Sequence, residues 1–260
     1  MLAHIDQGSG PPVLLLHGGA LDHRLWEPQI AALARTHRVV APDLRGHGAS
    51  PTPTAPFRHV DDVAALVRDL RLDPVTVAGV SLGASVAVDL AIEAPELVAR
   101  LVVSGAGASG AKFRDPATLD LLARWAQAGR DRDRERWTAI FLELGFGPGR
   151  PFADVDPAVL AHVARMTDGT LDHHVPDGAP VLPVPVADVE ARLPTLQVPV
   201  LAITGLLDSP DHQRMAREVA QAAGGRVVEV AGAGHYPNLE RPEIVTGALQ
   251  AFLREHFPGS

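Results

Sequence analysis

The chain has 260 residues, a formal net charge of -8 and no cysteine. This length can bury a sizeable core within one domain. The negative charge argues against a nucleic-acid partner, and the lack of cysteine excludes disulfides, a cysteine nucleophile and thiolate metal sites. No apolar run is long enough to span a bilayer, and the first residues lack a basic region followed by an apolar one. We expect a cytoplasmic protein without a membrane partner.

Six apolar runs along the chain have the composition of buried strands. They fall near residues 12–16, 37–41, 75–79, 100–104, 198–203 and 226–231. Helical patterns separate most of them. Such alternation predicts an α/β fold with a mostly parallel, doubly wound sheet that is flanked by helices.

The alternation stops between about residues 109 and 194, where no convincing strand is found. Helices are expected there over 116–128, 132–144 and 157–167. We interpret residues 109–194 as a helical lid, inserted between the two parts of a core formed by residues 1–108 and 195–260. A loop that contains Pro176, Pro180, Pro183 and Pro185 leads back from the lid to the core.

Apolar residues of the predicted lid recur at helical spacing, which is typical of helices that pack on each other and on a core. Some of them must nevertheless face the cleft. We expect Trp125, Trp137 and Phe141, together with Val80 in the core, to line a largely apolar substrate pocket.

The segment Gly79-Val80-Ser81-Leu82-Gly83 stands between an apolar run and a helix-like stretch. A serine hydroxyl is a poor nucleophile in water, so an enzyme that uses one must expose it on a sharp turn. The two glycines lack the Cβ that would clash in such a turn, and the serine would lie at the positive end of the helix. We expect Ser81 to be a nucleophile. The alternative is a glycine-rich turn with an incidental serine.

A second apolar run ends in His17-Gly18-Gly19-Ala20. A turn of this kind can present backbone N–H groups to the oxyanion of a tetrahedral intermediate, which lowers the barrier by several kcal/mol. We assign this role to the N–H groups of Gly19 and Leu82, since Leu82 would open a helix and leave its N–H free. His17 is a competing base, but at a strand end its structural role is favoured.

An acid follows the strand-like run near residues 198–203. Asp208 would hold the tautomer of a catalytic histidine, because the loop end of the strand is where the acid must lie. Asp211, three residues further on, is the competing candidate. For both, the alternative role is to cap the helix that begins near Pro210.

The last strand-like run opens into Gly232-Ala233-Gly234-His235. His235 is expected to take the proton of Ser81 and return it to the leaving group, because imidazole titrates near neutral pH. Most of the other histidines are expected to be solvated or structural, among them His23, His37, His59, His162, His212 and His256. The pair His173-His174 lacks a third ligand at a recognisable spacing, so no metal is predicted.

With Ser81, Asp208 and His235 in that chain order, the sequence resembles the α/β-hydrolase superfamily. Further resemblance lies in the His17–Ala20 loop with Trp26, in residues 42–50, and in Asn238-Leu239-Glu240-Arg241-Pro242. Within the superfamily the chain looks most similar to small carboxylesterases and 3-oxoadipate enol-lactonases. The resemblance implies cleavage of a small-molecule ester or lactone through an acyl-enzyme, without a cofactor, by a monomer or homodimer.

Several alternatives stay open after this resemblance. Carbon–carbon bond hydrolases, perhydrolases, cofactor-free oxygenases and non-catalytic ligand-binding homologues share the same fold. A serine at position 81 argues against epoxide hydrolases and dehalogenases, which use an aspartate there. Asp43 and Arg45 imitate a catalytic pair, but we expect them to tie their glycine-rich loop through charge-assisted hydrogen bonds. Members of the superfamily commonly begin with a two-stranded hairpin, and we expect its first strand to be missing here.

Overall fold

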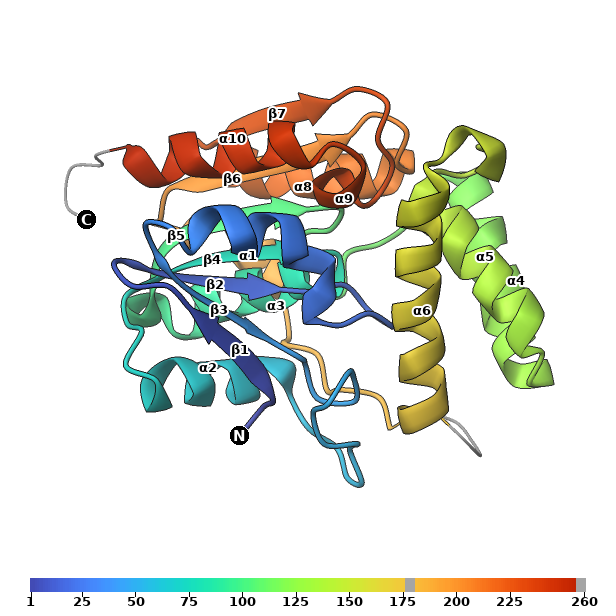
Figure 1. Ribbon diagram of the computed structural model, residues 1–260, viewed down its shortest axis with the longest axis horizontal. Helices are drawn as coiled ribbons and strands as arrows, with labels where there is room; N and C mark the ends of the chain where they lie inside the picture. Colours follow the sequence, from blue (N-terminus) through green and yellow to red (C-terminus); the bar gives the residue numbers. More distant parts are fainter. Residues whose placement is uncertain (176–180, 256–260) are drawn as a thin grey trace.

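The computed structural model describes residues 1–175 and 181–255. Within them, seven strands form one sheet in the order β1-β3-β2-β4-β5-β6-β7, in which β1 is antiparallel to β3 and all other neighbours are parallel (Figure 1). The strands are β1 (His4–Gln7), β2 (Pro12–Leu16), β3 (Arg38–Pro42), β4 (Val75–Val80), β5 (Val98–Ser104), β6 (Val200–Gly205) and β7 (Arg226–Val230). The predicted fold class is therefore confirmed.

Helices cover both faces of the sheet and enclose two apolar cores. One face carries α1 (Glu27–Leu33) and α10 (Pro242–Arg254), and the other carries α2 (His59–Asp69), α3 (Leu82–Glu93) and α8 (Pro210–Ala222). On β2, Val13 and Leu15 enter the first core, whereas Leu14 and Leu16 enter the second. Burial on both faces is why the strands are near-continuous apolar runs. Each buried leucine contributes about 1.5–3 kcal/mol.

The register of the central strands aligns their carboxyl ends. Leu16 of β2 pairs with Gly79 of β4, and Ser104 of β5 pairs with Val80 on one side and Ile203 on the other. In an open α/β sheet, ligands bind outside the carboxyl ends of the strands. The loops that follow β2, β4, β5 and β6 therefore meet at the edge where a site is expected.

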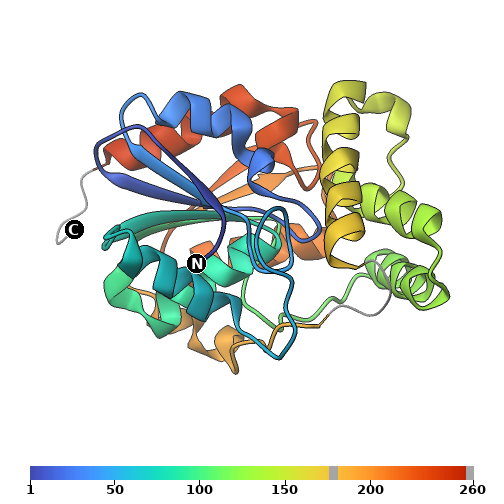
Figure 2. The ribbon, with the colours of Figure 1, turned by 60° about the horizontal axis from the view of Figure 1, so that its bottom comes forward.

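The remaining helices are short turns along the core and a group of three longer helices. They are η1 (His23–Trp26), η2 (Pro95–Leu97), α4 (Pro116–Asp131), α5 (Arg134–Phe146), η3 (Phe152–Asp154), α6 (Pro157–His174), α7 (Val189–Arg192), η4 (Leu193–Thr195) and α9 (Pro237–Glu240). Figures 1 and 2 show α4, α5 and α6 side by side beyond the carboxyl ends of the strands. Residues 116–174 are called the α4–α6 segment below.

The α4–α6 segment has clear local signals for its helix ends. Asp115 accepts a hydrogen bond from Thr118 N at 2.8 Å, and a proline occupies the first turn of α4. Arg132 adopts a left-handed conformation with φ 57°, which ends α4, and Asp133 caps α5. These caps place the start of α5 two residues after the position expected from periodicity, because Asp133 lies outside the helix as its N-cap.

One antiparallel strand, β1, precedes β2 in the sequence and forms an edge of the sheet. His4–Gln7 pairs with Val39–Pro42 of β3. This strand, β1, was not among the six expected from apolar runs, because its four residues contain only one aliphatic side chain, Ile5. On the return path to the core, the described Pro183 and Pro185 flank Val184, whose N–H donates to Phe57 O at 2.7 Å. Pro176, Pro180 and His256 lie outside the described residues.

Three histidines, His17, His47 and His59, form a row of tilted rings that begins in the loop after β2. The ring centroids of His17 and His47 are 5.1 Å apart, and those of His47 and His59 are 6.3 Å apart. Burial lowers the pKa of His47 to about 3 and that of His59 to about 4, and it lowers the pKa of His17 as well. The folded protein therefore holds these rings neutral at pH values at which the unfolded chain would protonate them.

This cluster predicts a loss of stability in acid. Below the unfolded-state pKa of about 6.5, the unfolded chain binds more protons than the folded one, so the free energy of unfolding falls as pH decreases. For His59 alone, about 3 kcal/mol would be lost between pH 7 and pH 4. Urea unfolding of the wild type and His59→Gln at both pH values measures this. A variant with the same pH dependence as the wild type would contradict the assignment.

Candidate active site

Ser81 lies on a strained turn between β4 and α3. Its backbone has φ 54° and ψ -118°, a region that costs a non-glycine residue about 1–3 kcal/mol. The turn is held from both sides: Ser81 N donates to Ser104 O at 2.8 Å, and Ser81 O accepts from Ser85 N at 3.0 Å. Strain of this kind is retained where the surrounding structure over-determines it, as at a nucleophile elbow.

The two glycines that flank Ser81 are required by close packing. A Cβ on Gly79 would overlap the carbonyl oxygen of Gly83, and a Cβ on Gly83 would overlap the carbonyl oxygen of Leu16. The first contact allows the chain to reverse sharply around Ser81. The second brings the first turn of α3 against the end of β2.

The loop after β2 lies directly over this turn. A Cβ built on Gly18 would stand 3.5 Å from Cβ of Ser81, and one built on Gly19 would stand 4.0 Å from Cβ of Leu82. Among the described residues, neither Gly19 N nor Leu82 N has a hydrogen-bond acceptor. Both are therefore available to an oxyanion, and the N-terminus of α3 favours negative charge there. Their assignment as oxyanion donors stays a prediction.

Asp208 and His235 form a buried hydrogen-bonded pair. Asp208 follows β6, His235 follows β7, and His235 Nδ1 lies 2.7 Å from Asp208 Oδ2. Burial alone would raise the pKa of Asp208, but His235 and His212 outweigh it and hold the pKa well below its usual range. The carboxylate is therefore ionised, and it accepts from Nδ1–H of His235. This leaves Nε2 unprotonated in the neutral ring.

Burial also lowers the pKa of His235, although Asp208 opposes the shift. The ring is consequently neutral at neutral pH. A neutral imidazole with a free Nε2 can act as a general base.

Gly105 links the Ser81 turn to the Asp208–His235 pair. It directly follows Ser104, the residue whose carbonyl oxygen holds Ser81 N. A Cβ on Gly105 would lie 2.5 Å from Cε1 of His235 and 3.4 Å from Oδ2 of Asp208. Three loops thus converge at the carboxyl edge of the sheet. The structure pairs the predicted acid with the predicted base and places Ser81 on a neighbouring loop. Among the described residues no hydrogen bond joins Ser81 to His235. The roles of nucleophile, acid and base stay a prediction.

The α4–α6 segment holds the loop that carries His235. His235 N donates to Gly145 O at 2.9 Å, and Gly234 N donates to Glu240 Oε1 at 2.7 Å. The other carboxylate oxygen of Glu240 accepts from Arg150 at 2.6 Å, and the side chains of this pair are only 12% and 4% exposed. The end of α5 holds the backbone of His235 directly through Gly145, and the following turn holds that of Gly234 through Arg150 and Glu240.

We expect Arg150→Met to lower the free energy of unfolding by about 3–5 kcal/mol, because it leaves the charge of Glu240 buried without its partner. Chemical denaturation measures the change. The double variant Arg150→Met/Glu240→Gln is the matched control, since the glutamine keeps an acceptor for Gly234 N and removes the unpaired charge. It should recover part of the loss. If the double variant were no more stable than Arg150→Met, the buried charge would not be the cause.

The competing candidates have structural partners in the described residues. Asp211 accepts from the N–H groups of Arg114 and Asp115, both at 2.8 Å, and pairs with Arg214 at 2.8 Å. His17 contacts Gly18 O through Nδ1 at 2.7 Å and accepts from Leu44 N through Nε2 at 2.8 Å. Neither residue is placed like Asp208 or His235.

Asp43 and Arg45 tie the loop between β3 and α2. Asp43 accepts from His23 N and from Ala49 N, both at 2.9 Å. Arg45 forms a bidentate pair with Asp62, with contacts of 2.7 Å and 2.5 Å. These contacts are the structural role that the sequence predicts for the loop.

The residues predicted to line the pocket lie in two places. Val80 is fully buried directly before Ser81. Trp125, Trp137 and Phe141 form an aromatic cluster between α4 and α5, in which the rings of Trp137 and Phe141 stack at 5.3 Å with an angle of 11°. Their contacts in the structure are with one another and with the cores, so their part in binding substrate stays a prediction.

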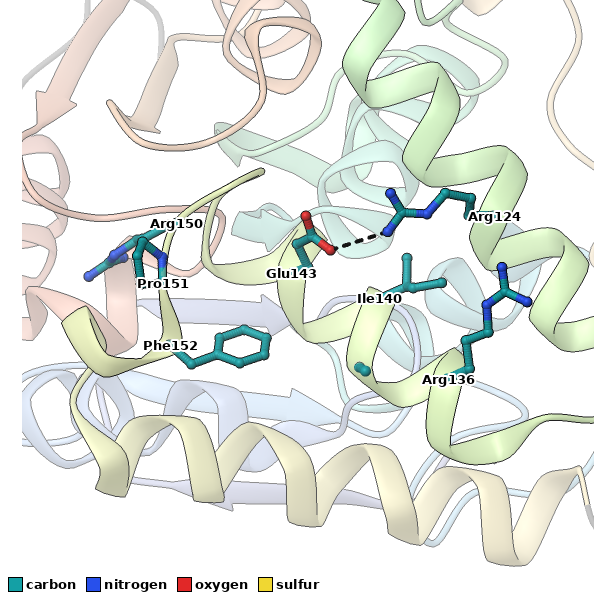
Figure 3. Close-up of a pocket in the computed structure, with 8 residues that line it drawn as sticks. Arg124, Arg136, Ile140, Glu143, Arg150, Pro151 and Phe152 are labelled. Atoms are coloured by element: carbon teal, nitrogen blue, oxygen red, sulfur yellow. Dashed lines mark ion pairs between the residues drawn. The ribbon is translucent and has the colours of Figure 1, made fainter.

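A pocket of about 480 Å³ opens elsewhere on the α4–α6 segment (Figure 3). Its lining residues are Arg124, Arg136, Ala139, Ile140, Glu143, Arg150, Pro151 and Phe152. Figure 3 shows Arg124 pointing to Glu143, with which it forms an ion pair at 3.6 Å. None of the lining residues belongs to the loops of Ser81, Asp208 or His235.

Two clusters of described residues bring three possible metal ligands within 4.8 Å of one another. One consists of Asp208, His212 and His235. Its contacts of 2.7 Å and 3.0 Å fit hydrogen bonds, whereas two ligands on one tetrahedral zinc ion stand about 3.3 Å apart. The other is Asp22, His23 and Asp43, in which Arg24 already neutralises Asp22. The predicted absence of a metal and a cofactor stays a prediction.

Comparison with known proteins identifies the family of this fold and site. The chain belongs to the alpha/beta hydrolase family, whose sequence model matches residues 13–248. It is 31% identical to a putative non-heme bromoperoxidase, BpoC, from Mycobacterium tuberculosis, over 97% of both chains. It is also 29% identical to the carboxylesterase YbfK from Bacillus subtilis, over 94% of this chain and 80% of that one.

A solved structure shares the fold over nearly the whole length. The enol-lactonase from Burkholderia xenovorans superposes with a TM-score of 0.75 and 26% identity, over 98% of this chain and 96% of that one. Names of this kind support hydrolase activity. In the described part of the chain, no helix is long and apolar enough to cross a membrane.

His212, which the sequence analysis grouped with the solvated or structural histidines, is buried against Asp208. Its Nδ1 lies 3.0 Å from Asp208 Oδ1, and its ring centroid lies 4.2 Å from that of His235. The sequence signal that could have identified His212 is its distance of four residues from Asp208. At the start of a helix, side chains four residues apart lie on the same face.

Proposed function

We propose that the protein is a serine hydrolase that cleaves a carboxylic ester or lactone through an acyl-enzyme. One observation carries this proposal. Ser81 lies on a strained turn whose N–H is bound by the carbonyl oxygen of Ser104. The next residue, Gly105, packs against the Asp208–His235 pair. A reacting carbonyl beside Ser81 could therefore meet a base on one side and free N–H groups on the other.

The reaction follows from these positions. Nε2 of His235 takes the hydroxyl proton as Ser81 Oγ attacks the carbonyl carbon, and the oxyanion is held by Gly19 N–H and Leu82 N–H. His235 then gives the proton to the departing alkoxide, which leaves an ester on Ser81. Water attacks this acyl-enzyme with His235 again as base. The bond between the acyl carbon and Ser81 Oγ then breaks, His235 returns the proton to Ser81, and the carboxylic acid departs. Asp208 stays ionised and stabilises the imidazolium that forms in each half.

We propose further that residues 109–194 act as the lid of this site. Helices α4–α6 lie beyond the carboxyl ends of the strands (Figure 2). Their apolar side chains would offer an apolar wall to a substrate. In this proposal the size of the acyl pocket is set by Trp125, Trp137 and Phe141, together with Val80 beside the nucleophile. Substrate selectivity would then depend on the lid more than on the triad.

The test is turnover of a chain-length series of p-nitrophenyl esters and of simple lactones, combined with labelling by a fluorophosphonate. We expect saturable hydrolysis of at least one class and a single label on Ser81, located by peptide mass. Labelling of Ser81 without turnover of any ester or lactone would overturn that substrate class and favour a carbon–carbon bond substrate. Folded protein with neither turnover nor label would overturn the hydrolase and favour a binding role.

A second activity is favoured by the similarity to BpoC, a protein named as a putative bromoperoxidase. Hydrogen peroxide in place of water would convert the acyl-enzyme to a peroxycarboxylic acid and free Ser81. Bromide oxidation in the presence of an ester and hydrogen peroxide tests this. If oxidation continues without the ester or without Ser81, an acyl-enzyme is not its source.

A further inference from the structure

Asp208 carries a second imidazole in addition to that of His235. His212 Nδ1 contacts Asp208 Oδ1 at 3.0 Å, while His235 Nδ1 contacts Oδ2 at 2.7 Å. Each histidine therefore occupies its own carboxylate oxygen. Both side chains are largely buried, with 11% of His212 and 6% of His235 exposed.

The hydrogen-bond donors around Asp208 define the protonation of both rings. Ser209 N–H donates to Oδ1 at 2.7 Å, so Oδ1 accepts from Ser209 and His212, and Oδ2 accepts from His235. An ionised carboxylate has no proton to donate. Both histidines must therefore carry their proton on Nδ1 in this arrangement.

The local fold keeps the ring of His212 in place. Its N–H donates to Ser209 Oγ at 3.2 Å, which caps the start of α8. Phe113 contacts the ring edge-on, with centroids 5.4 Å apart. The neighbouring charges on α8, Asp211 and Arg214, pair with each other at 2.8 Å. His212 is thus a fixed donor that faces Asp208 and His235.

We propose that His212 is a positioning residue for the hydrolase reaction: its Nδ1–H fixes the rotation of the Asp208 carboxylate, so that Oδ2 is aimed at His235. The inference rests on the proposed function, because it assigns His212 a role through the Asp208–His235 pair. Without His212, Ser209 N–H would be the only donor to Oδ1, and Oδ2 would be held only by His235, the residue that it must orient. The donor from His212 adds a second contact on Oδ1 that is independent of His235.

The same donor draws negative charge toward Oδ1 and away from His235. Removing it leaves Oδ2 a stronger partner for the imidazolium form of His235. The acid limb of the pH profile should then move to higher pH. A residue that only fills space would leave the limb unchanged.

Two variants of His212 distinguish a role as hydrogen-bond donor to Asp208 from a role in packing alone. His212→Phe keeps an aromatic ring and loses the donor, whereas His212→Asn keeps an N–H group near the position of Nδ1. With p-nitrophenyl butyrate, we expect kcat of His212→Phe to fall about tenfold with KM within twofold, since one charge-assisted hydrogen bond is lost. His212→Asn should recover kcat to within about threefold of the wild type. His37→Phe, at the opposite end of the sheet, is the matched control for a histidine-to-phenylalanine change.

The proposal would be overturned if His212→Phe had the kcat of the wild type and the acid limb of its pH–rate profile did not move. Equal losses in His212→Phe and His212→Asn at the same Tm would overturn it too. The downfield proton resonance of the Asp208–His235 hydrogen bond gives a readout that needs no substrate. It should shift in His212→Phe and stay in place in His212→Asn. If Ser81 proves not to be a nucleophile, this resonance still decides whether His212 positions the pair.

Discussion

Replacing Ser81 with alanine is expected to lower kcat for ester hydrolysis by about 10⁴-fold or more. Alanine has no oxygen to form the acyl-enzyme, so only oxyanion binding and substrate positioning would remain. The loss should appear in kcat rather than in KM, because the hydroxyl group contributes little to binding the ground state. Steady-state kinetics with the best p-nitrophenyl ester measure it, and the fluorophosphonate label should disappear from the variant.

Ser85→Ala is the matched control for this change. Ser85 lies one turn along α3, and its N–H donates to Ser81 O through the backbone, which the substitution leaves intact. Its activity should stay within about twofold of the wild type. If Ser81→Ala kept a tenth of the wild-type kcat, the turnover would come from another group and the acyl-enzyme route would be wrong.

Asp208→Asn is expected to lower kcat by about 10³–10⁴-fold at neutral pH. The carboxylate accepts a hydrogen bond from His235 Nδ1 at 2.7 Å, and it thereby selects the ring form whose Nε2 is free. An asparagine amide can donate to Nδ1, which moves the ring proton to Nε2. That ring can no longer accept the proton of Ser81, and the cation formed in the transition state also loses its counter-charge.

Asp211→Asn is the control for this second change, because it alters the competing acid on the same helix. Asp211 holds the backbone N–H groups of Arg114 and Asp115 and the side chain of Arg214. We expect kcat within about threefold of the wild type and a lower Tm. The opposite pattern, with loss of turnover in Asp211→Asn and retention in Asp208→Asn, would exchange the roles of the two acids.

The sequence predicts the core of this molecule well because its signals are local. Apolar runs buried on both faces identify the central strands, and Gly79 is required by its contact with Gly83 in the same turn. Gly83 belongs to the same recognisable pentapeptide, although the contact that requires it is with Leu16 of β2. The edge strand β1 was not predicted because none of its four residues is fully buried and its hydrogen bonds are made with β3. Its formation depends on a partner more than thirty residues away, which a short polar segment does not reveal.

Site residues whose position depends on tertiary packing were harder to predict. Trp125, Trp137 and Phe141 have the helical spacing of a packed face, and that spacing does not show which side of the face meets a cleft. His212 is a comparable case. Its sequence surroundings suggest an ordinary helix start, and only the placement of α8 after β6 brings its ring onto Asp208.

The contacts of residues 145–150 bear on how new substrate preferences could be built into this scaffold. Gly145 O binds His235 N, Arg150 binds Glu240, and a Cβ on Gly234 would lie 2.5 Å from Phe146 O. This short strip belongs to the α4–α6 segment by sequence and to the histidine loop by contact. If the helices of the α4–α6 segment are exchanged between related enzymes, residues 145–150 should therefore be kept from the protein that supplies the sheet. A cut made at the outer boundaries of the proposed lid would replace Gly145, a backbone partner of His235, along with the lid helices.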